Sequence, residues 1–184
     1  LAFVNRSYDY ILVIDDFDQQ NNFEFSLLSA PISMQIDKSE GSIFWSPEQS
    51  EIGDHRIKVQ VKDDTGLTAE QTFNINVILN HSPKIISPPE IFSLSNKVYS
   101  YEVKAVDSDG DNLTYNLLEK PEGMTISGEG VINWLATQKS KESIEVQVSD
   151  IYGFKEIQSY VLITVDDTDF DGVNDQIDQC PDSV

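Results

Sequence analysis

The chain is short of basic residues relative to acidic ones. Among its 184 residues, 12 Lys and Arg stand against 32 Asp and Glu, which gives a formal net charge of −20. Nucleic acids and anionic lipid surfaces are bound through Lys and Arg, so this balance excludes nucleic-acid partners and favours cations. Hydrophobic residues still make up 39% of the chain and aromatics 10%, so it has enough apolar side chains to fold around a core.

Long apolar runs are also missing. A membrane-spanning helix needs about 20 consecutive apolar residues. The longest fully apolar runs here, such as residues 11–14, are far shorter. We therefore expect no direct membrane insertion. The chain starts at Leu1, with no basic segment leading into an apolar one. We expect a fragment whose targeting signal lies elsewhere.

Cysteine and catalytic signatures are scarce. The single Cys180 has no partner within the chain, so it is either a free thiol or half of a disulfide to a cysteine beyond Val184. The sequence has no HExxH, GxSxG, P-loop or dinucleotide glycine pattern. We expect His55 on a strand edge and His81 in a linker, both without a catalytic role. The chain is therefore predicted not to be an enzyme.

What the sequence does contain is a repeat. Residues 8–77 are echoed by residues 99–165, with Tyr8 matching Tyr99 and Trp45 matching Trp134. Apolar and polar residues alternate within HRIKVQVKD and ESIEVQVSD, which is typical of half-buried strands. Short strands at regular spacing without a helical period predict an all-β chain of two tandem antiparallel Greek-key β-sandwiches. The expected parts are 1–80 with a truncated first strand, 81–166, and a calcium-binding loop at 167–184.

The C-terminal segment DTDFDGVNDQID has the spacing of a calcium loop. Counted from Asp167, acids fall at positions 1, 3, 5, 9 and 12, with Gly172 at position 6 and a main-chain carbonyl at position 7. These are the ligand positions of a 12-residue EF-hand-type loop, and hard oxygen ligands in this number favour Ca²⁺ over Mg²⁺. The candidate ligands are Asp167, Asp169, Asp171, Val173, Asp175 and Asp178. No amphipathic helices flank the loop, so it is not a helix-loop-helix sensor.

A second acidic motif lies within the second β unit. The segment DSDGDNLTY places Asp107, Asp109 and Asp111 at alternate positions just before the expected strand at Leu113. Carboxylates at this spacing repel one another unless a cation lies between them, so a metal is one interpretation. An Asp-Gly turn between two strands is the other.

Two family resemblances follow from these motifs. Residues 167–182 (DTDFDGVNDQIDQCPD) resemble a thrombospondin type 3 repeat. That resemblance implies that the loop acids bind calcium, that Cys180 forms half of a disulfide, and that the chain is extracellular, where conditions are oxidising. Residues 1–166 resemble the dystroglycan-type cadherin-like and Ig-like repeats of bacterial surface proteins, through DSDGDNLTY, Pro121, Trp134 and VSDIYG.

The cadherin-like resemblance implies calcium ligands near the domain junctions. The matching positions are Asp107, Asp109, Asn112 and Asp150 in the second unit, Asn80 in the linker, and Asp16, Asp18 and Asp63 in the first unit. The linker VILNHS lacks most of the acids of a cadherin linker, so at most one calcium is expected between the units. Asp166 and Asp167 follow the second unit, which makes the C-terminal junction the better calcium site.

Together these patterns predict a calcium-binding adhesion or spacer module of a larger cell-surface or secreted bacterial protein. Calcium ions are the predicted partners, together with a protein or polysaccharide at a cell surface. An incomplete edge strand also leaves self-association open. Two alternatives remain: a non-catalytic accessory module of a secreted hydrolase, for carbohydrate binding or spacing, and a segment of an envelope protein.

Overall fold

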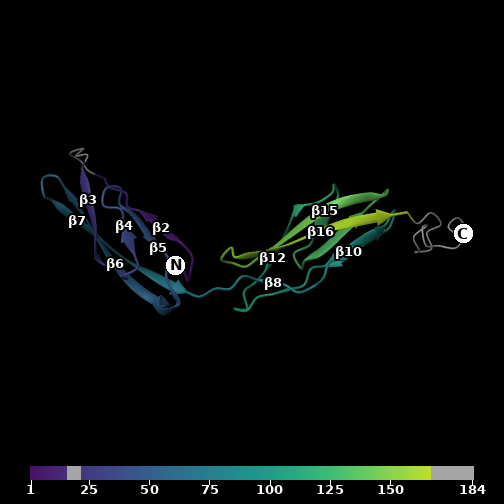
Figure 1. Ribbon diagram of the computed structural model, residues 1–184, viewed down its shortest axis with the longest axis horizontal. Coiled ribbons are helices and arrows are strands. Elements are labelled where there is room, and N and C mark those ends of the chain that lie inside the picture. Colours follow the sequence, from purple (N-terminus) through teal and green to yellow (C-terminus); the bar gives the residue numbers. More distant parts are fainter. Residues whose placement is uncertain (16–21, 167–184) are drawn as a thin grey trace, which may run out of the picture. The chain divides into compact units, whose positions relative to one another are not determined.

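The computed structural model describes residues 1–15 and 22–166 (Figure 1). These residues form β-strands and loops, with one 3₁₀ turn, η1 (Gln49–Glu51), and no α-helix within the described ranges. None of the described segments is therefore an apolar helix of membrane-spanning length. The chain divides into two units, Leu1–Asn80 and His81–Val184. The prediction of an all-β fold is confirmed.

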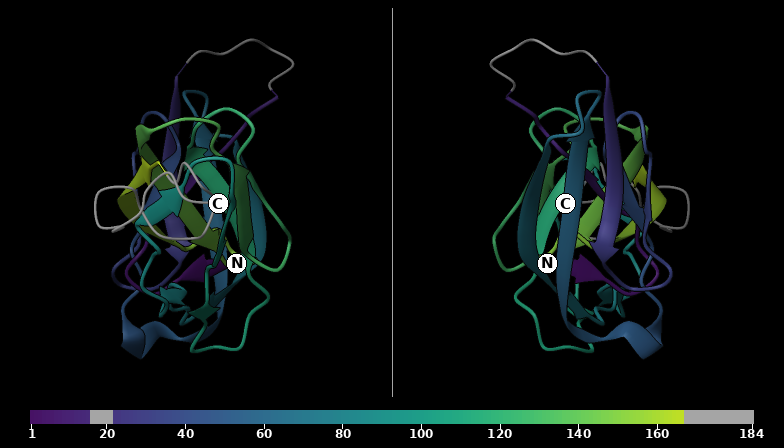
Figure 2. Two further views of the ribbon diagram at one scale, coloured as in Figure 1. Left: turned by 90° about the vertical axis from the view of Figure 1, so that its right-hand side faces the viewer. Right: turned by 90° about the vertical axis from the view of Figure 1, so that its left-hand side faces the viewer.

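The first unit packs two sheets face to face. One sheet has the strand order β1-β7-β6-β3 and the other β2-β5-β4; β3, β6 and β7 are seen side by side in Figures 1 and 2. The strands are β1 (Ala2–Phe3), β2 (Tyr8–Ile11), β3 (Phe23–Ser29), β4 (Gln35–Ile36), β5 (Ser42–Trp45), β6 (Gly53–Asp63) and β7 (Thr68–Ile78). Alternate residues of β6 and β7, such as Ile57 and Ile75, are buried between the sheets, as the period of two in the sequence predicts.

The second unit repeats this arrangement and adds one strand pair. Its sheets have the orders β9-β16-β15-β12 and β10-β14-β13, and β8 pairs with β11. The strands are β8 (Lys84–Ile85), β9 (Phe92–Leu94), β10 (Val98–Glu102), β11 (Ala105–Val106), β12 (Thr114–Glu119), β13 (Thr125–Ile126), β14 (Val131–Leu135), β15 (Ser140–Ser149) and β16 (Lys155–Val165). As β1 does with β7, the short β9 runs parallel to the last long strand.

The repeat seen in the sequence is a repeat of backbone geometry. Tyr8 pairs with Trp45 across β2 and β5, and Tyr99 pairs with Trp134 across β10 and β14. Ahead of each tyrosine, an asparagine has a positive φ: 61° at Asn5 and 60° at Asn96. Asparagine tolerates this left-handed conformation better than most residues. The alignment of the two units is therefore confirmed in three dimensions.

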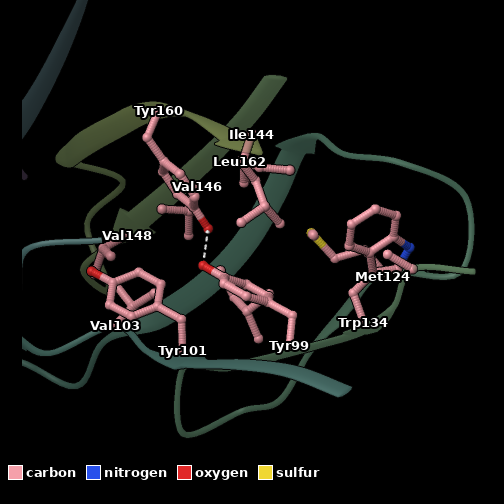
Figure 3. Packing of buried hydrophobic residues seen from close by; sticks show 12 residues of the cluster. Tyr99, Tyr101, Val103, Met124, Trp134, Ile144, Val146, Val148, Tyr160 and Leu162 are labelled. Carbon is pink, nitrogen blue, oxygen red and sulfur yellow. Dashed lines mark hydrogen bonds between the residues drawn. The ribbon is translucent and has the colours of Figure 1, made fainter. Parts of the chain in front are cut away.

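Aromatic side chains pack among aliphatic ones in the core of the second unit (Figure 3). The Tyr99 hydroxyl donates to the carbonyl oxygen of Glu90 at 2.7 Å and lies 3.1 Å from the hydroxyl of Tyr160. Tyr101 packs edge-on against Tyr160, with ring centroids 6.0 Å apart. The indole N–H of Trp134 donates to the carbonyl of Glu122 at 3.0 Å. Each buried ring thus has its polar atom satisfied, which a tightly packed core requires.

The two units differ at their N-terminal strands. The first unit has β1, the counterpart of β9, so its predicted truncated strand is present over Ala2–Phe3. Within the described residues, it has no counterpart of β8. Consequently residues 12–15, which correspond to the stretch that pairs with β8 in the second unit, pair with no described strand.

Candidate metal centre

Three aspartates converge in the turn between β11 and β12 of the second unit. Asp107, Asp109 and Asp111 each offer a carboxylate oxygen, and these oxygens lie within 4.8 Å of one another; we call these residues the carboxylate cluster. The turn is organised by Asp107, whose Oδ1 accepts from the main-chain amides of Asp109 at 2.8 Å and Asp111 at 3.4 Å. Gly110, with φ of 80°, allows the chain to bend between the two amides.

The remaining oxygens of the cluster are poorly compensated. Oδ2 of Asp107 and Oδ2 of Asp111 are buried and have no hydrogen-bond partner within the part of the chain that the structure describes. Loss of solvent, and then the negative charges of Asp107, Asp150 and Asp109, raise the pKa of Asp111. Buried polar atoms without partners are costly. A cation or a proton at this position would remove that cost.

His81 is hydrogen-bonded to Asp109, the member of the cluster that lies between Asp107 and Asp111 in the sequence. Its main-chain amide donates to Oδ2 of Asp109 at 2.6 Å, and its ring Nδ1 lies 3.0 Å from Oδ1. The backbone hydrogen bond from His81, followed by the side-chain one, lowers the pKa of Asp109. The expectation that His81 is only a linker residue is therefore incomplete, because it ties the start of the second unit to the carboxylate cluster.

Asp150 lies near the cluster but is held by its own turn. It directly follows β15, is only 5% exposed, and accepts from the amides of Tyr152 at 2.8 Å and Phe154 at 2.9 Å through Oδ1. Thr114 pairs with Ser149, so Asp150 follows β15 at the end of the sheet where the cluster precedes β12. After loss of solvent, the charge of Asp150 is among those that raise the pKa of Asp111. Asn112 is exposed and adjoins Asp111. A ligand role for either residue stays a prediction.

The other described candidates are engaged elsewhere. Asp63 is the last residue of β6 and begins the turn to β7, as Asp150 begins the turn after β15. The Oδ1 of Asp63 accepts from the Thr65 hydroxyl and the Leu67 amide, both at 2.8 Å. The Thr65 hydrogen bond is the main cause of the lowered pKa of Asp63. Asp166 forms an ion pair with Lys139 at 2.6 Å. Asn80, the last residue of the first unit, is buried.

The remaining predicted ligands lie outside the described residues. They are Asp16 and Asp18 of the first unit and Asp167, Asp169, Asp171, Val173, Asp175 and Asp178 of the C-terminal loop, together with Cys180. The first-unit site and the C-terminal loop therefore stay predictions.

The alternating spacing of Asp107, Asp109 and Asp111 pointed to this turn, whereas the cadherin-like resemblance selects Asn112 and not Asp111 as a ligand. The structure groups Asp111 with the other two aspartates, and a metal here stays a prediction. Nothing in the local sequence indicates His81, which is 28 residues from Asp109 along the chain. His55 lies in β6, where it pairs with Ile75 of β7, and its ring packs edge-on against Trp45 at 5.1 Å. Its Nε2 donates to the carbonyl of Glu51 at 2.6 Å.

Comparison with known proteins places the fold. A family model described as "Putative Ig domain" matches residues 3–78 and again residues 82–165. No curated protein matches the chain. Among solved structures, the fibronectin(III)-like modules of Clostridium thermocellum CbhA are similar, with 13% identity, a TM-score of 0.56, and coverage of 90% of this chain and 88% of that one.

Two larger proteins show weaker likeness. An endo-fucoidan hydrolase of glycoside hydrolase family 107, MfFcnA4, is 17% identical over 90% of this chain, with a TM-score of 0.41. The chain spans only 27% of its length. Cadherin domains 3–6 of protocadherin gamma B2 are 14% identical over 78% of this chain and 43% of that one, with a TM-score of 0.37. From the family match over both units, the chain belongs to the Putative Ig domain family, of which it contains two tandem copies.

Proposed function

We propose that the chain is a calcium-binding, non-catalytic module of an extracellular protein, used for adhesion or spacing. The observation that carries this proposal is the carboxylate cluster, in which two buried oxygens, Oδ2 of Asp107 and Oδ2 of Asp111, lack hydrogen-bond partners among the described residues. Ca²⁺ is bound by carboxylate and carbonyl oxygens. One ion would compensate both oxygens and the repulsion among the three charges.

The ligand chemistry favours calcium over transition metals. The cluster offers only carboxylate oxygens, whereas zinc and copper sites draw on imidazole or thiolate. The ring of His81 is turned to Asp109 and would support a ligand rather than bind the ion. Asp150 would add a further negative charge near the cluster, and Asn112 would add a side-chain amide oxygen. Asn80, Asp166 and the C-terminal loop are the proposed sources of additional sites.

Calcium at this position would act on the start of the second unit. Because Asp109 accepts from the main chain of His81, an ion that fixes Asp109 also fixes the first residue of the unit. Extracellular modules bind calcium with dissociation constants of about 10⁻⁴–10⁻³ M, which suits millimolar calcium outside cells. We infer that calcium stiffens the entry to this sandwich, which suits a protein that holds a binding element at a distance.

Ser33, Glu51 and His55 lie together in the first unit, and their hydrogen bonds are those of packed side chains. This supports the non-catalytic part of the proposal. The Ser33 hydroxyl donates to Glu51 at 2.5 Å and accepts from the indole N–H of Trp45 at 2.8 Å. His55 is engaged by the main-chain carbonyl of Glu51 instead of by Ser33. Because the imidazole of His55 is hydrogen-bonded to this carbonyl and not to the Ser33 hydroxyl, the three side chains do not form a Ser-His-acid relay.

Calorimetric titration of Ca²⁺ into the chelator-treated full chain tests the proposal. We expect Asp111→Asn to weaken one class of sites by at least about tenfold, as ligand-shell changes do. Asp171→Asn is the matched variant for the C-terminal loop, and Asp9→Asn, an exposed strand position, is the control for lost charge. If Asp111→Asn binds the same number of ions with the same affinity as the parent chain, the cluster is not a calcium site.

A further inference from the structure

The first unit has a groove beside residues 12–15, which follow β2 and pair with no described strand. The groove has a volume of about 380 Å³ and runs between residues 12–15 and the strands β6 and β7. Its apolar lining includes Leu12, Val59 and Val61, and Tyr10 and Gln71 also line it. Val13, within residues 12–15, is 92% exposed.

In the second unit, a strand of the same chain fills the corresponding place. Ala105 and Val106 of β11 pair with Ile85 and Lys84 of β8. The amide of Ile86 then donates to the carbonyl of Lys104 at 2.8 Å. The Ile85 side chain packs on the hydrophobic core. By the alignment of the two units, Lys104, Ala105 and Val106 correspond to Val13, Ile14 and Asp15.

The core is less buried in the first unit than in the second, as expected when the counterpart of β8 does not cover it. Val103 and Val148 are 1% and 0% exposed in the second unit. Their counterparts in the first unit, Leu12 and Val61, are both only partly buried. Apolar side chains left half in water lose part of the free energy of burial. The first unit therefore has a core with one side uncovered.

A polar pair that lines the groove, Tyr10 and Gln71, also has a counterpart in the second unit. In the second unit, Tyr101 lies 2.9 Å from Oε1 of Gln158, and both side chains donate to the carbonyl of Ser87, just after β8, at 3.0 and 2.9 Å. In the first unit, Gln71 donates to the hydroxyl of Tyr10 at 3.3 Å. The same two side chains are thus in place for the carbonyl of an incoming strand.

We propose that this groove is the acceptor site for one more β-strand, an extended segment of the same polypeptide that would run into β1 as β8 runs into β9. Its chemistry would follow β8: an apolar residue at the place of Ile85 and a small hydroxyl residue at the place of Ser87. The carboxylate of Glu156, which accepts from the amide of Ile85, has no equivalent, because Ala69 takes its place.

A covalently joined strand is favoured over a separate one. Residues 86–91 connect β8 to β9 in the second unit, so a connection of that length lets a strand reach this groove in this fold. Linkage gives such a strand a millimolar effective concentration. A free peptide that pairs with only two residues lacks this advantage. The inference concerns the first unit and is independent of calcium.

The test is a graft on the full chain. The sequence of residues 82–91, SPKIISPPEI, is placed directly before Leu1, and the control graft carries Asp in place of the copied Ile85. The first graft is expected to raise the unfolding temperature of the first unit and to slow amide exchange at residues 13–15 at least about tenfold, while the control graft does neither. Equal behaviour of the two grafts overturns the proposal.

Two further measurements test whether a separate peptide or a second copy of the chain fills the groove instead of a joined strand. The free peptide SPKIISPPEI is added to the ungrafted chain at millimolar concentration, and weaker protection than from the graft is expected. Protection equal to that of the graft would overturn the choice of a joined strand. Sedimentation of the ungrafted chain is the second measurement: a dimer in which residues 13–15 are protected would show that a second copy fills the groove instead.

Discussion

The main-chain amide of Asp111 donates to Oδ1 of Asp107 at 3.4 Å, while the other carboxylate oxygen of each residue is buried without a hydrogen-bond partner among the described residues. The turn therefore brings together charges that it does not compensate. Such a site is destabilising when empty and stabilising when a cation occupies it. A substitution that removes one of these charges should therefore change the unfolding temperature in opposite directions without and with calcium.

Asp111→Asn is expected to raise the unfolding temperature of the chain in chelator, because it removes repulsion from Asp107 and Asp150. In millimolar calcium, the same variant is expected to unfold at a lower temperature than the parent chain, because it loses a ligand. Thermal scans with chelator and with calcium check both signs, with Asp9→Asn as the control. A variant that shifts equally in both conditions would contradict the prediction.

Gly130→Ala is expected to destabilise the second unit by about 1–2 kcal/mol or more, the strain of a left-handed residue. Gly130 has φ of 84°, and an added Cβ would lie 2.8 Å from the carbonyl oxygen of Val103 and 2.9 Å from the ring of Tyr115. The matched control is Gly128→Ala, where nothing lies within 4 Å, and a change within about 0.5 kcal/mol is expected there. Urea unfolding of both variants measures the difference, and equal midpoints would refute it.

Tyr99→Phe is expected to lower stability by about 1 kcal/mol at neutral pH, because the hydroxyl hydrogen bonds to Glu90 and Tyr160 are lost. Burial, and then the hydrogen bond to Tyr160, raise the pKa of Tyr99 far above its ordinary 10.0. Stability linked to Tyr99 is therefore complete below pH 10 and declines above it, where the unfolded chain ionises this residue and the folded chain does not.

Denaturant unfolding between pH 8 and 12, read with tyrosinate absorbance, tests this linkage. The parent chain should lose stability more steeply with rising pH than Tyr99→Phe does, over roughly the range above the ordinary tyrosine pKa. Identical slopes for the two chains would show that Tyr99 ionises as readily in the folded unit as in the unfolded one.

Asp37→Asn is expected to reduce the acid sensitivity of the first unit. The hydroxyl of Ser39, followed by the amides of Glu40 and Ser39, lowers the pKa of Asp37 below its ordinary 3.8. The stability from this carboxylate is present above pH 3.8 and is lost as pH falls through the lower pKa of the folded state. Urea midpoints between pH 5 and 2 should fall less for Asp37→Asn than for the parent chain. The exposed Asp64→Asn is the control, and a slope equal to the parent's would contradict the assignment.

Much of the fold could be predicted because its signals are local and occur twice. The alternation in β6 and β15 identifies strands, and the shared Tyr and Trp positions align the two units, as their pairing in β2–β5 and β10–β14 confirms. The alternating aspartates also predicted a close carboxylate cluster. An Asp-x-Asp-x-Asp turn brings its side chains together by short-range geometry alone, so no distant residue is needed to form it.

Contacts between distant residues were not predictable in this way. The indole of Trp45 meets Ser33, which in turn meets Glu51, a residue of the η1 turn. This turn has no counterpart among the described residues of the second unit. His81 reaches Asp109 through the packing of the first residues of the second unit against its β11–β12 turn. Neither contact leaves a spacing pattern, because each depends on how loops of different length fold back on the sheets.

Hydrophobic period and turn spacing act over a few residues, so the class of fold, the duplication and the positions of the clustered acids could be read from the chain. Three properties appeared only in the folded units: carboxylate oxygens that are buried without partners among the described residues, the contact of His81 with Asp109, and a core of the first unit that is open where β8 closes the second. Those properties depend on which surfaces meet in the folded unit. Packing across the whole unit decides which surfaces meet, so no single stretch of residues predicts them.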